Sequence, residues 1–304
     1  MNAQPTLAQL KFFVAVADAG SFSEAAAELN VSQSSLSEAV AKLEKILGQP
    51  LLRRTTGGTT LTPAGQRAME HARVALLAIS DLHLAVAMND ALSGTLRIAT
   101  HRSLGVHILA PVLFALNQKH PALQVHVQDS ESDGAGGQEL IRSGQVDAGF
   151  IDAPSGDGLL WWPLLADEYH AVVPASRGAA PLTWAELRTA HLILTPSANT
   201  CHRHVQAYLR AHDVQATQLR EVEEDGVILK MVEHGLGVTL MPRLAFEPLL
   251  PGLRVVALPA PLTRHLGVAV RPGRAGLPHI KAFMQAVRLH LPAPQGAYTP
   301  LRPT

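Results

Sequence analysis

Apolar side chains recur at helical spacing in three consecutive segments at the start of the chain. The segments are residues 7–19, the heptapeptide EAAAELN and residues 32–47. In each, apolar positions repeat three and four residues apart. Asn30 and Val31 make a tight turn between the second and third segments, so this region predicts a helix-turn-helix. The third helix is expected to end at Gly48 and to face inward with Leu36, Val40, Leu43 and Leu47.

Two short β-prone arms follow the third helix. They are Leu51–Thr55 and Thr59–Thr62, and they flank Gly57 and Gly58. A Gly-Gly pair between such arms is typical of a β-hairpin. The first arm is basic, so this hairpin is expected to form a wing beside the helix-turn-helix.

A long helix is predicted from Pro63 to about Ala91. Thr62 precedes it as the N-terminal cap, and proline suits the first helical position. A helix of this length cannot bury its apolar seam on the small head, and a second copy of the chain is the expected partner. The seam alternates four- and three-residue steps in the manner of a coiled coil, at Ala68, Ala72, Ala75, Ile79, Leu82 and Val86.

From Ser93 onward, strand-like and helix-like segments alternate. GTLRIAT, LQVHVQD, VDAGFID, HLILTPS and HLGVAVRP are among the expected strands. Alternation of this kind favours parallel sheets with crossover helices. The fold class is therefore a helical head followed by an α/β region.

Composition restricts the choice of partners and compartment. The 304 residues are 47% hydrophobic and 16% charged, with a formal net charge of zero. Charge alone therefore points to no polyanionic partner, and the apolar content suits globular domains. Cys201 is the only cysteine, which excludes an internal disulfide framework and fits a reducing compartment. No secretory signal or membrane-spanning run is evident, so a cytoplasmic protein without membrane contact is expected.

The order of motifs in the head resembles that of the LysR-type transcriptional regulators. Their pattern combines A-S-F-type, A-A-x-x-L, S-Q-x-x-x-S, L-E-x-x-L-G-x-x-L-F-x-R and L-T-x-A-G elements. In this chain they read as Gly20-Ser21-Phe22, Ala26-Ala27-Glu28-Leu29, Ser32-Gln33 with Ser37, Leu43-Glu44 with Leu47-Gly48, Leu51-Leu52 with Arg54, and Leu61-Thr62-Pro63-Ala64-Gly65.

The resemblance covers nearly the whole chain and implies three parts. Residues 1–62 would form a winged helix-turn-helix, residues 63–92 a dimerising linker helix and residues 93–304 an effector domain. The effector domain would be similar to periplasmic solute-binding proteins. Its lobe I would contain about 93–166 plus 268–292, lobe II about 167–267, and the ligand cleft would lie between them. The resemblance also implies homodimers through 63–92 that assemble into homotetramers, and no cofactor.

Four of the six residues from Ser32 to Ser37 are serines. Their hydroxyls and the free amides of a helix N-terminus suit phosphate oxygens, and Gln33 can read an adenine edge in the major groove. The alternative is that Ser32 only caps the helix. Arg53 and Arg54 of the wing are expected at phosphates or in the minor groove, unless one merely caps the wing. The expected contacts to double-stranded promoter DNA are Ser32, Gln33, Ser34, Ser35, Ser37, Lys42, Arg53, Arg54 and Thr62.

The head departs from the family pattern in charge. Position 38 is often basic in these regulators but is Glu38 here, and residues 1–60 carry five Lys or Arg and five acidic residues. Weak non-specific affinity is expected, since each neutralised phosphate adds to binding by counterion release. Specificity would then depend on base contacts and on several linked heads.

Candidate effector contacts occur where three predicted strands end, because helix N-termini meet ligands at the carboxyl ends of strands. Hydroxyls, free amides and an arginine favour a small anion, a carboxylate above all. The alternative is that these groups are ordinary helix caps. The three sets are Thr100, His101, Arg102 and Ser103; Ser197, Asn199, Thr200, Cys201 and Arg203; and Asp225, Gly226 and Val227.

Cys201 admits three interpretations: a passive pocket-lining residue, a redox sensor or a metal ligand. Its position is loosely similar to that of the reactive cysteine in the OxyR branch, and a helix N-terminus near Arg203 would lower a thiol pKa. No second cysteine is present to resolve a sulfenic acid. His202 and His204 are two residues apart on a helix and point in different directions, so no metal site is expected.

The expected function is therefore that of a LysR-type regulator, not an enzyme, whose two-lobed domain senses a small anionic metabolite and alters promoter-binding geometry. One alternative is a thiol-based redox sensor of the same family. Another is an enzyme or binding module without a DNA role, but the effector region has no G-x-S-x-G, H-E-x-x-H, P-loop or G-x-G-x-x-G motif. Aromatic acids, amino acids and other small metabolites all suit such a cleft.

Overall fold

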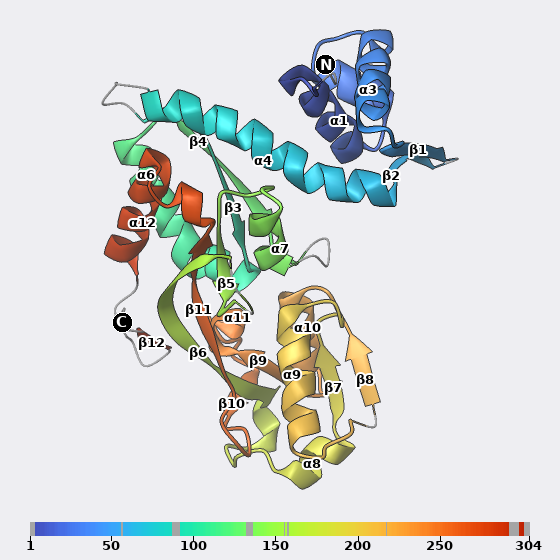
Figure 1. Cartoon of the computed structure of the whole chain (residues 1–304). Coiled ribbons are helices and arrows are strands. Elements are labelled where there is room, and N and C mark those ends of the chain that lie inside the picture. Colours follow the sequence, from blue (N-terminus) through green and yellow to red (C-terminus); the bar gives the residue numbers. More distant parts are fainter. Residues whose placement is uncertain are drawn as a thin grey trace. The chain divides into compact units, whose positions relative to one another are not determined.

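The computed structural model describes residues 4–55, 57–86, 92–131, 136–154, 156, 158–216, 218–291 and 298–300. It separates into two compact units, one containing residues 1–90 and the other most of the chain from residue 91 onward. Figure 1 labels the elements of both. No helix within the described residues is long and apolar enough to span a bilayer.

The first unit begins with three helices, α1 (Leu7–Ala19), α2 (Phe22–Glu28) and α3 (Gln33–Leu47). Ser21 and Ser32 cap α2 and α3 by accepting from the backbone amides three residues on, as N-cap serines do. Gly48 ends α3 in the left-handed conformation, at φ 69°. The prediction that Leu36, Val40 and Leu43 face inward is confirmed, because these side chains are at most 2% exposed. It is wrong for Leu47, which is 43% exposed in the last turn.

The predicted wing is an antiparallel pair, β1 (Leu52–Thr55) and β2 (Gly58–Leu61). The chain then passes closely over its own backbone at Gly65, where an added Cβ would lie 2.0 Å from the Leu51 carbonyl oxygen. Only glycine fits such an approach, which explains the glycine at the end of the Leu61–Gly65 motif.

The long helix α4 runs over Pro63–Val86, and the Thr62 hydroxyl accepts from the Gly65 amide at 2.9 Å. Part of the predicted seam packs within the unit: Ala72 is buried in a cluster with Phe13 and Leu43 of the head, and Ala68 packs against it. Leu82 is 57% exposed. The Val86 side chain and residues 87–91 lie outside the described residues.

The second unit is built around one eight-stranded mixed sheet. Strands β10, β6, β11, β5, β3 and β4 lie in that order, and β9 and β12 also pair with β6. The bounds are β3 Gly94–Thr100, β4 Leu123–Asp129, β5 Ala148–Asp152, β6 Leu160–Pro174, β9 Thr239–Pro242, β10 Leu253–Val256, β11 Thr263–Val270 and β12 Tyr298–Pro300. A separate parallel pair contains β7 (His191–Leu194) and β8 (Gln218–Glu221).

The expectation of parallel sheets is correct for only part of this region. The β3–β4, β3–β5 and β7–β8 pairs are parallel, whereas β6 pairs antiparallel with β9, β10, β11 and β12. The alternation of strands and helices does not predict that β6 and β11 pair directly with each other. Their register depends on contacts between residues distant in sequence.

Helices cover the sheet in two lobes. They are α5 (Arg102–Leu104), a π-helical turn η1 (Gly105–Leu109), α6 (Ala110–Lys119), α7 (Gly136–Arg142), α8 (Trp184–Thr189), α9 (Thr200–Ala211), α10 (Asp225–Glu233), α11 (Arg243–Phe246) and α12 (Pro278–His290), with 3-10 turns at Ala175–Arg177 and Pro272–Arg274. The first of these helices begins at Arg102, two residues after β3 ends at Thr100.

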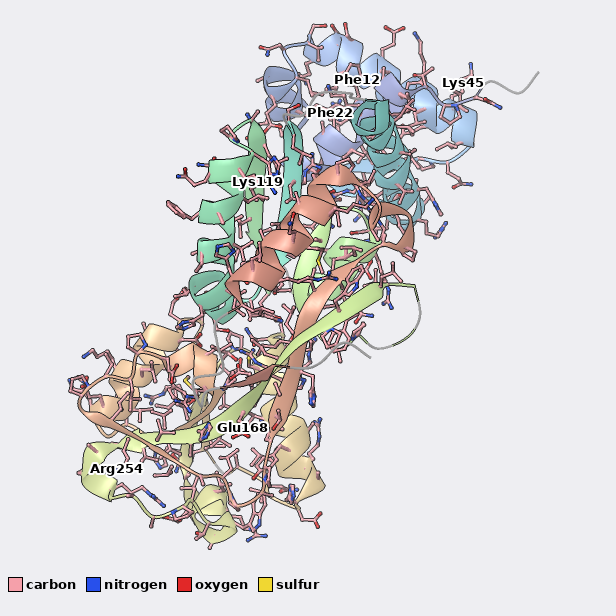
Figure 2. The ribbon with its side chains drawn as sticks, turned by 90° about the vertical axis from the view of Figure 1, so that its left-hand side faces the viewer. Phe12, Phe22, Lys45, Lys119, Glu168 and Arg254 are labelled. Atoms are coloured by element: carbon pink, nitrogen blue, oxygen red, sulfur yellow. The ribbon has the colours of Figure 1, made fainter. Side chains whose placement is uncertain are left out.

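The long strand β6 runs through both lobes. Its Leu165 belongs to the core that contains β3, α6 and α12, whereas Tyr169 belongs to the core around β7 and α9. Glu168 lies on β6 between these two buried residues, and Figure 2 labels it. Because Leu165 and Tyr169 belong to different cores, we propose that the two lobes divide near residues 166 and 167, as the sequence predicts.

Candidate functional site

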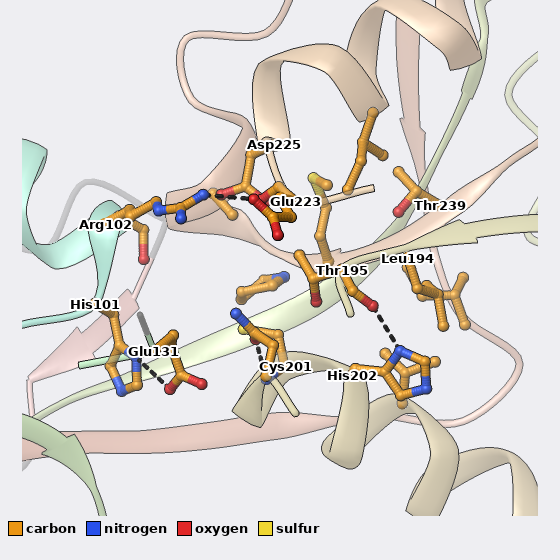
Figure 3. Close-up of a pocket in the computed structure, with 18 of the residues that line it drawn as sticks. His101, Arg102, Glu131, Leu194, Thr195, Cys201, His202, Glu223, Asp225 and Thr239 are labelled. Carbon is orange, nitrogen blue, oxygen red and sulfur yellow. Dashed lines mark hydrogen bonds and ion pairs between the residues drawn. The ribbon is translucent and has the colours of Figure 1, made fainter. Parts of the chain in front are cut away.

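The three predicted strand ends converge on one cavity between the lobes (Figure 3). His101, Arg102 and Ser103 enter it after β3, Asn199 and Cys201 after β7, and Asp225 after β8. The cavity volume is about 40 Å³, room for a few water molecules. A metabolite would therefore need the lobes to move apart.

Six of the twelve predicted effector contacts lie away from the cavity lining. Thr100 is buried and donates to the His101 carbonyl. Arg203 is exposed and donates to the Thr200 hydroxyl at 2.8 Å, which itself faces Glu131. The others are exposed loop or helix positions, Ser197, Gly226 and Val227.

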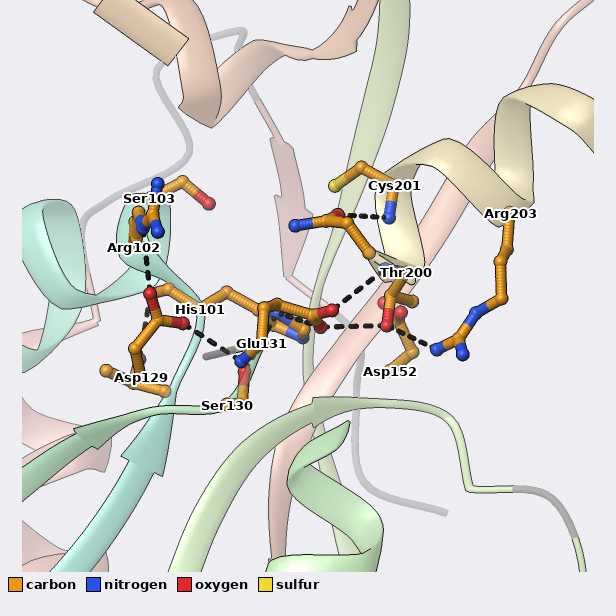
Figure 4. A network of polar contacts seen from close by, with 12 residues as sticks. His101, Arg102, Ser103, Asp129, Ser130, Glu131, Asp152, Thr200, Cys201 and Arg203 are labelled. Atoms are coloured by element: carbon orange, nitrogen blue, oxygen red, sulfur yellow. Dashed lines mark hydrogen bonds and ion pairs between the residues drawn. The ribbon is translucent and has the colours of Figure 1, made fainter. Parts of the chain in front are cut away.

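Glu131 occupies the position expected for the carboxylate of an effector. Its carboxylate oxygens accept from the Thr200 amide at 3.0 Å and the Thr200 hydroxyl at 2.8 Å, and one lies 3.2 Å from His101 Nδ1 (Figure 4). Burial opposes ionisation, but the contacts from His101 and Thr200 outweigh it and lower the pKa of Glu131. His101 and Thr200, two of the groups predicted to hold an effector anion, therefore already contact a carboxylate of the protein.

Arg264 of β11 is the buried cation of the cavity. Its guanidinium donates to Asp167 of β6 at 2.7 and 3.0 Å, to the Ser103 hydroxyl at 3.1 Å and to Cys201 Sγ at 3.4 Å. Arg264 and Asp167 side chains are 1% and 0% exposed. Because Arg264 contacts α5 in lobe I and α9 in lobe II, it joins the two sides of the cavity.

Burial raises the pKa of the Cys201 thiol to about 11, although the Arg264 guanidinium favours the thiolate. The thiol is consequently protonated near neutral pH, contrary to the lowered pKa considered from the helix N-terminus. His202 and His204 face different partners: His202 Nδ1 contacts the Thr195 carbonyl at 2.6 Å and His204 Nδ1 the Tyr169 hydroxyl at 3.1 Å. Among the described residues, no group of three potential ligands could hold a metal ion.

Sequence reasoning missed the acidic side of the cavity and Arg264. Asp129, Glu131 and Glu223 line it in addition to Asp225. Asp129 is the last residue of β4 and Glu131 follows it, a fourth strand end to which the same rule applies. Arg264 lies within a strand and gives no comparable signal. The apolar wall is formed by Leu194, Val205, Ile228, Leu240, Met241, Pro242 and Ala245.

In the head, the predicted serines gather at the start of α3. Ser32 Oγ lies 3.0 Å from Ser34 Oγ and 2.7 Å from Ser35 Oγ. These three serines and Gln33 are exposed, and Ser37 is half-buried. The Ser32 hydroxyl also caps the helix, so capping and an exposed polar surface occur together.

Some of the predicted basic and wing residues make contacts within the protein, and others do not. Lys42 forms an exposed i,i+4 pair with Glu38 at 2.7 Å. Arg54 stacks over the Phe22 ring at 4.9 Å, whereas Arg53 is exposed on the opposite face of β1. The Thr62 hydroxyl donates to the Pro50 carbonyl at 2.7 Å, which gives it a structural role at the wing.

These features define a helix-turn-helix head with a two-lobed sensing domain, and comparison with known proteins supplies the family. The LysR substrate binding domain matches residues 89–292, and the bacterial regulatory helix-turn-helix protein, lysR family, matches residues 7–66. The chain belongs to the LysR family of transcriptional regulators. This is a family of DNA-binding regulators and not of enzymes.

Individual relatives span almost the full chain. A probable HTH-type transcriptional regulator LrrA from Synechococcus elongatus is 34% identical and covers 94% of this chain and 97% of its own. A probable hydrogen peroxide-inducible genes activator from Streptomyces viridosporus is 30% identical, with 94% of each chain covered. A full-length OxyR variant from Pseudomonas aeruginosa shares the fold, with a TM-score of 0.76, 24% identity, and 99% and 100% coverage.

Proposed function

We propose that this LysR-type regulator binds promoter DNA through α3 and the wing, as a dimer joined by residues 63–92 that assembles into a tetramer. The exposed Leu82 on α4 supports a partner for the linker helix, because a long helix with an exposed apolar seam is stabilised by a second helix. We retain the division into 1–62, 63–92 and 93–304 for these three tasks.

For DNA recognition, the exposed start of α3 is the reading surface. Gln33 extends from the first turn beside three exposed serine hydroxyls, a surface narrow enough for the major groove. Arg53 is the wing side chain best placed for phosphate, because Arg54 is engaged with Phe22. The remaining predicted contacts, Ser37, Lys42 and Thr62, would act mainly by positioning this surface.

For sensing, a small-molecule effector would bind in the cavity between the lobes. The observation that carries this proposal is the Glu131–Thr200 contact, which spans the lobes across the cavity. An effector that enters would separate the lobes or replace that contact. The change would alter the spacing of DNA heads and hence promoter geometry, by an amount set by the effector's differential affinity for the two arrangements.

The test begins with selection from random DNA duplexes using the purified full-length protein. An enriched two-fold-symmetric site with half-sites about one helical turn apart is the expected result. Footprints of that site with and without candidate effectors then test the change in geometry. Failure to enrich any duplex at low salt would contradict the DNA-binding proposal, and identical footprints with a bound effector would contradict the coupling.

Thiol-based sensing at Cys201 is the second candidate. It is supported by the peroxide-related name of a 30% identical relative and by the Arg264 guanidinium 3.4 Å from Sγ, whereas the raised thiol pKa opposes it. A peroxide-dependent change in promoter binding that Cys201→Ser abolishes would support this function. An unchanged response in the variant would exclude it.

A further inference from the structure

The cavity has more carboxylates than its own cations neutralise. Four acidic side chains line it, Asp129, Glu131, Glu223 and Asp225, together with two arginines. Arg102 donates to Asp129 at 2.7 Å and lies 3.2 Å from a Glu224 carboxylate oxygen.

Arg264, the other arginine of the cavity, also has a carboxylate partner within the protein. Arg264 is paired with Asp167, which is completely buried behind the cavity. Glu131 is satisfied by Thr200 and His101. Both guanidiniums are therefore already paired with carboxylates of the protein.

Asp225 and Glu223 are the two cavity carboxylates that these contacts do not involve. Among the described residues, neither carboxylate accepts a side-chain hydrogen bond, but the charges of Arg102 and Arg264 act on Asp225, and Glu223 is exposed to solvent. Asp225 is half-buried at the start of α10. Figure 3 shows both side chains beside Arg102. Withdrawing a carboxylate from water is unfavourable, and burial raises the pKa of Asp225 although the charges of Arg102 and Arg264 act in the opposite direction.

We propose that the effector is a small organic cation, with an ammonium or amidinium group that binds Asp225 and Glu223 and an apolar body. The body would lie against Ile228, Leu240 and Met241 on the same cavity wall. This inference rests on the proposed sensing function and assigns its ligand class. A cation at Asp225 would supply a hydrogen-bond donor to its carboxylate, whereas a carboxylate there would face two like charges.

The test uses three probes of equal length: n-butylammonium, n-butyrate and n-butanol, at millimolar concentration and matched ionic strength. Thermal unfolding and calorimetric titration are measured on the full-length protein. n-Butylammonium is expected to raise Tm in a concentration-dependent manner and more than either other probe. An equal or larger rise with n-butyrate, or no rise with n-butylammonium, would overturn the proposal.

Two variants separate the site from general charge effects. Asp225→Asn is expected to lower n-butylammonium affinity by about tenfold or more and, without ligand, to keep or raise Tm, because it removes an unpaired half-buried charge. Asp213→Asn makes the same change in an exposed turn at φ 53°, which asparagine adopts readily. Asp213→Asn should bind like the parent protein, and cation binding that persists unchanged in Asp225→Asn overturns the assignment.

DNA binding is measured in parallel on the selected duplex. If the protein binds DNA but prefers n-butyrate, only the ligand class is wrong. If it binds n-butylammonium through Asp225 but enriches no DNA, the regulatory proposal fails and the cation site stands.

Discussion

The Glu131 carboxylate accepts two hydrogen bonds from Thr200, one from the backbone amide and one from the hydroxyl, across 69 positions of sequence. Glu131 follows β4 in lobe I and Thr200 begins α9 in lobe II. The helix N-terminus that sequence reasoning assigned to an effector anion is thus closed by the protein itself.

Replacing Glu131 with Gln should weaken this interlobe contact. We expect a loss of about 1–3 kcal/mol in the free energy of unfolding, because hydrogen bonds to a charged acceptor become neutral ones. Urea denaturation measures this loss, and amide hydrogen exchange at Thr200 should accelerate. Glu139→Gln, on the exposed side of α7, is the matched control. Unchanged exchange at Thr200 would show that the contact does not hold the lobes.

The same pair predicts a pH dependence. The pKa of Glu131 is lowered from 4.5 in the folded protein, so its contribution to stability is complete above pH 4.5. That contribution declines as the pH falls through the lower folded-state pKa. Urea denaturation of wild type and Glu131→Gln across acidic pH checks this, since the two stabilities should converge at low pH. A difference that stays constant would contradict the prediction.

Cys201 should react slowly with thiol reagents in the native protein. A pKa of about 11 instead of 9.0 leaves about 100-fold less thiolate near neutral pH. Iodoacetamide alkylation followed by mass spectrometry measures the rate, with protein unfolded in urea as the reference thiol. Alkylation of the folded protein as fast as the reference would favour the redox-sensing alternative.

Gln33 and Arg53 should affect DNA binding in different ways. Gln33→Ala is expected to cost about 1–3 kcal/mol at the specific site and to relax specificity at one base pair. Arg53→Ala should weaken all duplexes similarly and reduce the salt slope by about one. Fluorescence anisotropy over a salt series measures both effects. Lys45→Gln, at the exposed end of α3, should change little, and an equal loss there would mean that only total charge matters.

Removing one partner of the buried Arg264–Asp167 pair should destabilise the protein. Replacing both partners with apolar residues should destabilise it much less. Arg264→Met leaves the Asp167 carboxylate buried without its cation, a cost of about 3–5 kcal/mol. The double variant with Asp167→Leu should recover most of that loss, because no unpaired charge remains. Chemical unfolding measures both, with Arg254→Met, at an exposed position of β10, as the control (Figure 2). A double variant as unstable as the single one would contradict this account.

His279 provides a second pH-dependent contribution. Burial, with the nearby Arg274 charge, lowers its pKa from 6.5 to about 4. Below pH 6.5 the unfolded chain takes up the proton first, so stability falls between pH 6.5 and about 4, by on the order of 3 kcal/mol. His279→Gln should flatten this part of the stability profile in urea titrations, whereas exposed His126→Gln should not. An identical slope in His279→Gln would exclude this residue as the cause.

The sequence by itself determined the elements and the family. Caps at Ser32 and Gly48 and the turn at Asn30 are local requirements, and local requirements leave a pattern in the residues that meet them. The three strand ends were also visible, and they do converge on one cavity.

Only the tertiary structure decided which charges face one another. Glu131 meets Thr200 across 69 positions and Arg264 meets Asp167 across 97, and neither pair belongs to any periodic pattern. The antiparallel pairing of β6 with β11 places Arg264 opposite Asp167, and a strand's partners are set by packing that no short segment specifies. The sequence therefore predicted where the cavity lies, and the fold determined that its unpaired charge is negative.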